Sequence, residues 1–165
     1  MKKRNILFVV FLLLSLAINA FIVFEGATNG NDSSSQSFGV TNWVVDVIGK
    51  IDSNSWMVLD RDAAHALIRK LIGHFALFGV SGIFSTLMFL FINDSLKKKT
   101  QIVISSMMYG FFFAFISELA QYFTPGRYMS FLDVMIDFSG YVLFGGITFI
   151  IYLLIANHKS KKANQ

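Results

Sequence analysis

Ionisable and amide side chains interrupt a long apolar stretch in the second half of the chain. Residues 102–116 carry no charge, residues 117–140 introduce carboxylates, an amide and a guanidinium, and an apolar run then continues to residue 155. A charged side chain near the centre of a membrane-spanning helix costs roughly 2.5 kcal/mol or more. Such a cluster therefore indicates a site or a mutually paired polar core.

Two kinds of chemistry are open to these side chains. Glu118 and His74 are acid–base candidates, because carboxylate and imidazole groups commonly transfer protons in catalysis. Arg127 offers a bidentate fork for a phosphate or carboxylate group. The full candidate set consists of His74 and Glu118 as catalytic residues, and of Arg69, Lys70, Gln121, Arg127, Asp133 and Asp137 as ligand-binding residues.

Covalent and metal-assisted mechanisms find less support in the sequence. Ser81, in the sequence Gly-Val-Ser-Gly, lacks the glycine spacing of a nucleophile elbow. A divalent ion has candidate ligands in His74, Glu118, Asp133 and Asp137, but one histidine among scattered carboxylates has no diagnostic spacing. We therefore predict no metal and no other cofactor.

The segments that carry these residues are more apolar than a soluble domain. Of the 165 residues, 55% are hydrophobic, whereas soluble domains have about 45–50% even when glycine is counted. The chain has no cysteine, which excludes disulfides, thiol nucleophiles and cysteine-ligated metals. Lys and Arg gather at the ends of apolar runs, which is typical of membrane topology signals and not of nucleic-acid contact. We predict an all-α integral membrane bundle of about four transmembrane helices.

The lengths of the apolar runs divide the chain into five parts. Twenty uncharged residues at ~1.5 Å rise span the ~30 Å hydrocarbon core, so residues 5–24 form a first transmembrane helix. A basic start before an apolar core also fits a cleaved signal peptide. The predicted parts are a cytoplasmic N-terminus (1–4), the first helix (5–24), an extracytoplasmic loop (25–61), a core of three transmembrane helices (62–155) and a basic cytoplasmic tail (156–165).

The extracytoplasmic segment contains two different patterns. Residues 28–42 are rich in Ser, Asn and Gly without periodicity, which predicts a flexible loop. Residues 43–51 place apolar side chains at helical spacing near Trp43 and Trp56, which favours a short interfacial helix or, equally, a loop packed over the bundle. Asp60 or Asp62 is expected to cap the helix that follows.

Basic residues favour one side of the predicted bundle. Nine of the 14 Lys and Arg belong to the N-terminus, to residues 97–99 and to the C-terminal tail, which share one side if the chain crosses four times. The positive-inside rule then predicts cytoplasmic termini, with the turn around Arg127 facing outward.

Helical spacing predicts that the polar side chains meet at one depth. Lys70 and His74 share a face of the second span, Asp133 and Asp137 share a face of the last, and Glu118 lies about one turn before the outer end of the third. Lipid cannot satisfy such groups, so they turn inward. They form either an outward-facing site or a set of interhelical staples, and staples of about 0.6–2 kcal/mol each add little to so small a bundle. We favour a site.

The same residues resemble the VanZ-like membrane protein family. The resemblance rests on Lys70-x-x-x-His74-Phe75, Glu118-x-x-Gln121, Pro125-Gly126-Arg127, Asp133 and Gly140, and it covers roughly residues 62–155. It implies an integral protein of a bacterial cell membrane, and the family namesake is associated with low-level resistance to the lipoglycopeptide teicoplanin. One departure is visible, since the family commonly has Asn at the position of Asp137.

The residues and the resemblance together predict a protein that acts on or binds a cell-envelope lipid or lipid-linked precursor and contributes to teicoplanin resistance. Its expected partners are the lipid bilayer and that lipid, and no nucleic acid. The alternative is a non-catalytic structural or assembly protein whose buried charges are interhelical staples. The residues leave open whether the site is catalytic and whether the chain forms oligomers.

Overall fold

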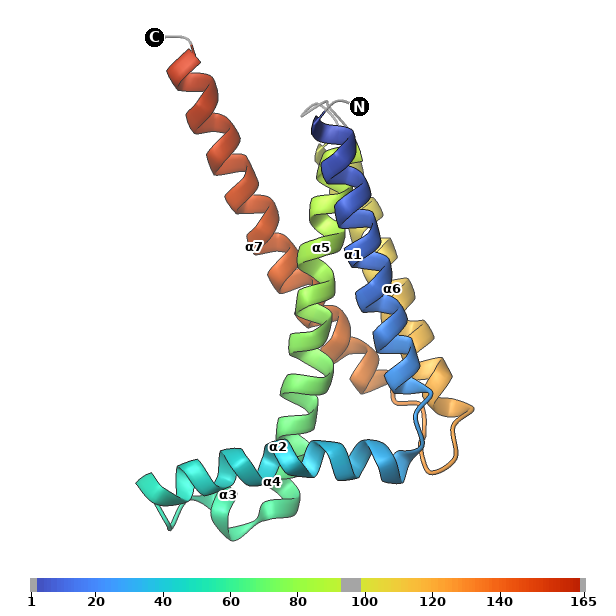
Figure 1. Ribbon diagram of the computed structural model, residues 1–165, viewed down its shortest axis with the longest axis vertical. Coiled ribbons are helices and arrows are strands. Elements are labelled where there is room, and N and C mark those ends of the chain that lie inside the picture. Colours follow the sequence, from blue (N-terminus) through green and yellow to red (C-terminus); the bar gives the residue numbers. More distant parts are fainter. Residues whose placement is uncertain (1–2, 93–98, 164–165) are drawn as a thin grey trace.

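The computed structural model describes residues 3–92 and 99–163, and these residues form helices without any strand (Figure 1). Four helical segments within them are long and apolar enough to cross a membrane. The predicted all-α membrane bundle is thereby confirmed. Three of the basic residues used to predict orientation, Lys2, Lys97 and Lys98, lie outside the described residues.

The spans follow the apolar runs closely. They consist of α1 (Lys3–Gly26), a continuous segment of α4 (Arg61–Ile68), η1 (Arg69–Ala76) and α5 (Leu77–Ile92), then α6 (Lys99–Tyr122) and α7 (Phe131–Ala163). α7 runs past the predicted end at residue 155, so the basic tail continues the last helix. Asp60 caps α4 as expected, because its side chain accepts a hydrogen bond from the backbone N–H of Ala63 at 3.0 Å.

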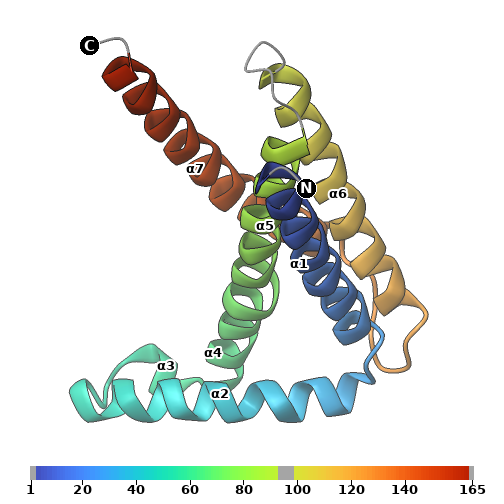
Figure 2. The same ribbon diagram turned by 45° about the horizontal axis from the view of Figure 1, so that its top comes forward.

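α5 is the central helix of the bundle. It packs against α1 on one side and α7 on the other, and α6 contacts all three. Figures 1 and 2 show α7 crossing the bundle obliquely, with its C-terminal half diverging from the other spans. The first turn of α1 and the last turn of α7 lie at the same end, opposite α2 (Gly30–Ile51), which runs across the other end of the bundle.

Two glycines let α7 approach its neighbours at backbone distance. A Cβ at Gly140 would collide with the backbone carbonyl of Phe75, and a Cβ at Gly82 would collide with that of Tyr141. Gly146, by contrast, faces open space, with nothing within 4 Å of an added Cβ. The close approach at Gly140 holds α7 against η1, the segment that carries His74.

The η1 segment is a π-helix inside an otherwise α-helical span. Its i→i+5 hydrogen bonds widen the turn, a feature that frequently occurs at functional sites. Lys70 and His74 both face α7 from this segment. The Lys70 ammonium lies 3.0 Å from Asp133, and His74 Nδ1 lies 2.9 Å from Asp137 Oδ1. The two pairs are four residues apart along η1 and four residues apart along α7. They thus form a ladder between these two segments.

The prediction of a flexible loop over residues 28–42 was wrong. α2 begins at Gly30 and continues to Ile51, so the predicted short helix is its C-terminal part. Ser and Gly are poor helix formers, but tertiary contacts override this preference. Phe38 stacks on His65 of α4 with ring centroids 3.8 Å apart, and Ser37 Oγ lies 2.8 Å from Nε2 of the same histidine. A four-residue helix, α3 (Trp56–Leu59), completes the connection to α4.

A buried polar network ties α1 to α5 and α6 near the middle of the bundle. Ser15 Oγ lies 2.8 Å from Ser85 Oγ, and Ser81 donates to Asn19 Oδ1 at 2.9 Å. Tyr109 from α6 joins the same network through Ser15 and Asn19. Because lipid offers no partners, such groups pair with one another across helices. The network accounts for polar residues within the otherwise apolar α1.

Candidate functional site

Three ionisable side chains from three different segments meet below the end of the bundle that α2 covers. His74 comes from η1, Glu118 from α6 and Asp137 from α7. His74 Nδ1 lies 2.9 Å from Asp137 Oδ1 and 3.9 Å from Glu118 Oε1. Both carboxylates are completely buried, and the His74 side chain is 12% exposed. Placing two carboxylates around one imidazole inside a bundle is unfavourable unless the charges are compensated.

Glu118 is held in a fixed orientation by two donors. The side-chain amide of Gln121, one turn later on α6, donates to Oε1, and the backbone N–H of Ser130 donates to Oε2 at 3.0 Å. Ser130 immediately precedes α7, so the Glu118 carboxylate joins α6 to the start of α7. The Glu118-x-x-Gln121 spacing therefore places an amide donor one helical turn from the carboxylate that it orients.

The Lys70–Asp133 pair lies outside this buried cluster. The Lys70 side chain is 41% exposed and that of Asp133 17%, which is far more than the two buried carboxylates. Neither residue lines the cavity described below. An exposed pair of this kind contributes about 0–1 kcal/mol, so it steadies the η1–α7 contact only slightly.

Arg127 caps the C-terminal end of α1. Its Nη1 donates to the carbonyls of Glu25, Gly26 and Thr28 at 2.6, 3.2 and 3.3 Å. The last carbonyls of a helix lack partners within the helix and carry its negative dipole end, which a guanidinium satisfies. The Arg127 Nε is buried without a hydrogen-bond partner among the described residues. Arg127 therefore has a structural role that its position in a turn did not indicate.

Burial lowers the pKa of the Arg127 guanidinium from its ordinary value, and the neighbouring Arg69 guanidinium lowers it further. Glu118 and Glu25 act in the opposite direction. Arg127 is still a cation near neutral pH, because the pKa of an arginine starts far above neutral. The two guanidiniums consequently place two positive charges close together, which Glu25 and Glu118 offset in part.

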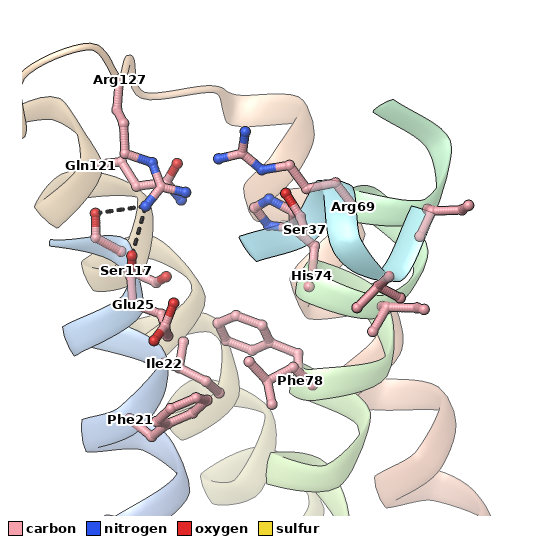
Figure 3. Close-up of a pocket in the computed structure, with 16 residues that line it drawn as sticks. Phe21, Ile22, Glu25, Ser37, Arg69, His74, Phe78, Ser117, Gln121 and Arg127 are labelled. Carbon is pink, nitrogen blue, oxygen red and sulfur yellow. Dashed lines mark hydrogen bonds between the residues drawn. The ribbon is translucent and has the colours of Figure 1, made fainter. Parts of the chain in front are cut away.

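A cavity of about 400 Å³ lies below these two arginines, between α1, α2, η1, α5 and α6. Figure 3 shows Arg69 reaching toward Arg127 across the cavity, with Phe21, Ile22 and Phe78 on the opposite wall. The remaining polar lining is provided by His74, Gln121, Ser117, Ser37 and Glu25. This volume lies within the range of small-molecule sites, and a polar end joined to an apolar end suits an amphiphile.

The structure places the eight predicted site residues in three groups. His74, Glu118, Asp137 and Gln121 form the buried cluster. Arg69 and Arg127 stand at the polar end of the cavity, which His74 and Gln121 also line. Lys70 and Asp133 form the more exposed pair, about one turn along η1 and α7 from the His74–Asp137 pair. Their functional roles stay predictions.

Sequence reasoning missed the residues that α1 and α2 contribute. Glu25, Ser37 and Phe21 line the cavity, although none had been a candidate. An available signal was Asn19, a strongly polar side chain four residues after Ser15 within an uncharged span. That spacing marks a face of α1 that must point into the bundle and not toward lipid.

A bundle of four candidate membrane spans that encloses a charged cluster and a cavity defines a multi-pass helical membrane protein. A family model described as VanZ/LLP1 matches residues 8–155, and the chain belongs to this family. The resemblance noted from the motifs of residues 62–155 is thereby confirmed and extends into α1. Comparison with curated proteins gave no significant match, and comparison with solved structures gave none.

Proposed function

We propose that this VanZ/LLP1 protein binds the anionic headgroup of a cell-envelope lipid or lipid-linked precursor in the cavity between α1, α2, η1, α5 and α6. The polar end of the ligand lies between Arg69 and Arg127, and its apolar part lies against Phe21 and Phe78. In a bacterial cell membrane with cytoplasmic termini, this end of the bundle faces outward, where envelope precursors and lipoglycopeptides are found.

The juxtaposition of two guanidiniums over an apolar wall is the observation that carries this proposal. Arg69 forms no ion pair or hydrogen bond with any side chain that the structure describes, and Arg127 uses only Nη1 in its contacts with carbonyls. Like charges held together in a partly buried position repel each other. A phosphate or carboxylate relieves this repulsion and matches the planar donor geometry of arginine.

His74 is the group best placed to transfer a proton to or from a bound headgroup. It lines the cavity, whereas Glu118 and Asp137 lie behind it. Asp137 holds Nδ1, which fixes the orientation of the ring and leaves Nε2 for contact with a ligand. If the bound molecule is transformed, the reaction depends on His74.

The binding proposal is tested by identifying the lipids that copurify with the protein. Wild type, Arg69→Gln and Arg61→Gln are extracted with a lipid-retaining polymer, and bound lipids are quantified by mass spectrometry. Arg61 is a matched control, because it is on the same helical segment but pairs with Asp46 at 3.0 Å on the exposed side of α2. We expect an anionic amphiphile to be enriched with wild type and Arg61→Gln and lost with Arg69→Gln. An unchanged lipid profile across all three proteins contradicts the proposal.

A structural role is the second candidate, and the ladder between η1 and α7 favours it. His74–Asp137 and Lys70–Asp133 join the same two segments in matching register. In that case substitutions lower the amount of protein in the membrane in parallel with any phenotype. Under the binding proposal, Arg69→Gln lowers teicoplanin resistance in a host that depends on this protein, at unchanged membrane abundance measured by immunoblot.

A further inference from the structure

We propose that His74, Glu118 and Asp137 bind a divalent transition-metal ion next to the cavity. This site goes beyond the headgroup proposal and does not rest on it. Spacing along the chain did not indicate the site, because its three ligands come from three segments. The convergence of those segments is what brings one imidazole nitrogen and two carboxylates together.

The geometry of the three side chains fits an ion. One ligand atom from each lies within 4.8 Å of the others. Ligand atoms bound to a tetrahedral Zn²⁺ at about 2.0–2.2 Å lie about 3.3–3.6 Å apart, so side-chain rotations that bring the atoms closer by about 1 Å are enough to close the set. His74 Nδ1 already lies 2.9 Å from Asp137 and 3.9 Å from Glu118. In the bound form the Nδ1 lone pair is directed to the ion, and the imidazole proton resides on Nε2.

An independent observation at Asp137 points to a missing positive partner. The residue is completely buried, and its Oδ2 atom has no hydrogen-bond partner among the described residues. Oδ1 contacts His74, so Oδ2 is the oxygen of Asp137 that is left for a further partner. A buried carboxylate oxygen normally has a donor or a cation as its partner. A metal ion satisfies Oδ2 in a way that no neighbouring side chain of the described residues does.

Charge balance leads to the same conclusion. Glu118 and Asp137 bring two buried negative charges, and His74 offers at most one positive charge in return. Lys70 is 3.0 Å from Asp133 and is partly exposed, so it is engaged elsewhere. A divalent ion bound to neutral His74 neutralises both carboxylates. Binding then releases any proton that His74 or a carboxyl group carried before.

The donor set indicates the class of ion. One imidazole and two carboxylates are borderline ligands that suit Zn²⁺ and Mn²⁺ better than the softer Cu⁺. Three protein ligands also leave a coordination position for water or another oxygen ligand, as in catalytic zinc sites. Gln121 and the Ser130 amide hold Glu118 in place, which is the support that metal-ligating carboxylates usually have.

The site is tested with the full chain in lipid nanodiscs, purified without a polyhistidine tag and treated with a chelator. Zn²⁺ binding is measured by isothermal titration calorimetry for wild type, His74→Gln and Asp137→Asn. Asp62→Asn is the control for the loss of a carboxylate, because Asp62 is exposed on α4 and lies outside the cluster. His65→Ala controls for adventitious binding at another histidine.

We expect one Zn²⁺ per wild-type chain, with affinity lowered about tenfold or more by His74→Gln and Asp137→Asn and unchanged in both controls. Equal binding in all five proteins, or no saturable binding to wild type, overturns the proposal. If the variants do not fold, the Zn²⁺ titration of wild type still tests the proposal, because it must show one saturable site per chain. Pulsed electron paramagnetic resonance of bound Mn²⁺ should show coupling to a single imidazole nitrogen, and its absence contradicts the site.

Discussion

Removing His74 should destabilise the bundle far more than removing Lys70, although both residues pair with an aspartate of α7. His74 faces two fully buried carboxylates, so His74→Ala leaves them without their positive neighbour. Breaking a buried pair in this way costs about 3–5 kcal/mol. The Lys70–Asp133 pair is partly exposed, and Lys70→Ala should cost less than about 1 kcal/mol.

The two pairs can be compared directly by reversible unfolding in bicelles. A chelator is present throughout, so that only the side chains contribute to the difference in free energy of unfolding. The double substitution His74→Leu/Asp137→Leu should recover most of the loss caused by His74→Ala, because apolar residues often replace a buried ion pair without cost. Glu118 keeps its two donors, Gln121 and the Ser130 amide, in that variant.

Two outcomes would contradict the role of His74 as the compensating partner of the buried carboxylates. If His74→Ala and Lys70→Ala cost the same small amount, the buried carboxylates do not depend on the imidazole for compensation. If the double substitution is as damaging as the single one, the loss arises from packing around η1 and not from an unpaired charge.

Three further predictions concern packing, the polar network and orientation. Gly140→Ala should destabilise the protein by about 1–3 kcal/mol through overpacking against η1, whereas Gly146→Ala, which faces open space, should change stability little in the same unfolding assay. Asn19→Leu should cost about 0.6–2 kcal/mol, because it leaves the buried Ser81 hydroxyl without its acceptor and removes the Asn19 contact with Tyr109, and an unchanged stability would argue against the network. The chain contains no cysteine, so single substitutions report topology: Tyr128→Cys should react with an impermeant maleimide on intact cells and Lys159→Cys only after lysis. The reverse labelling pattern would place the cavity at the cytoplasmic side.

The spans were predictable because long uncharged apolar runs are typical of membrane-spanning helices and rare in soluble domains. The equal depth of His74, Glu118 and Asp137 was also predictable, since it follows from helical rise and the position of the turn after α6. That Lys70 is partly exposed while Asp137 is buried was not predictable. These positions depend on how α7 crosses the bundle and on the π-helical turn in η1. No spacing rule specifies either feature.

The α2 helix shows the opposite case, in which local sequence misled. Its Ser- and Gly-rich first half has low helix propensity, and contacts with α4 and the α6–α7 turn stabilise it. One such contact is the Gly30 backbone N–H, which donates to the Pro125 carbonyl at 3.3 Å. The partners of Arg127 were hidden for the same reason, because the carbonyls of Glu25 and Gly26 are about a hundred residues away in the chain.

We propose that the cavity below Arg69 and Arg127 binds an anionic amphiphile. The most direct measurement is a titration of delipidated protein with short-chain phosphatidylglycerol, followed by native mass spectrometry, with short-chain phosphatidylcholine for comparison. We predict saturable binding of one phosphatidylglycerol, weakened about tenfold or more by Arg69→Gln because a charge-assisted hydrogen bond of about 1.5–3 kcal/mol is lost. Arg61→Gln should bind as wild type does. Equal affinity of wild type and Arg69→Gln, or no preference for phosphatidylglycerol over phosphatidylcholine, would contradict the claim.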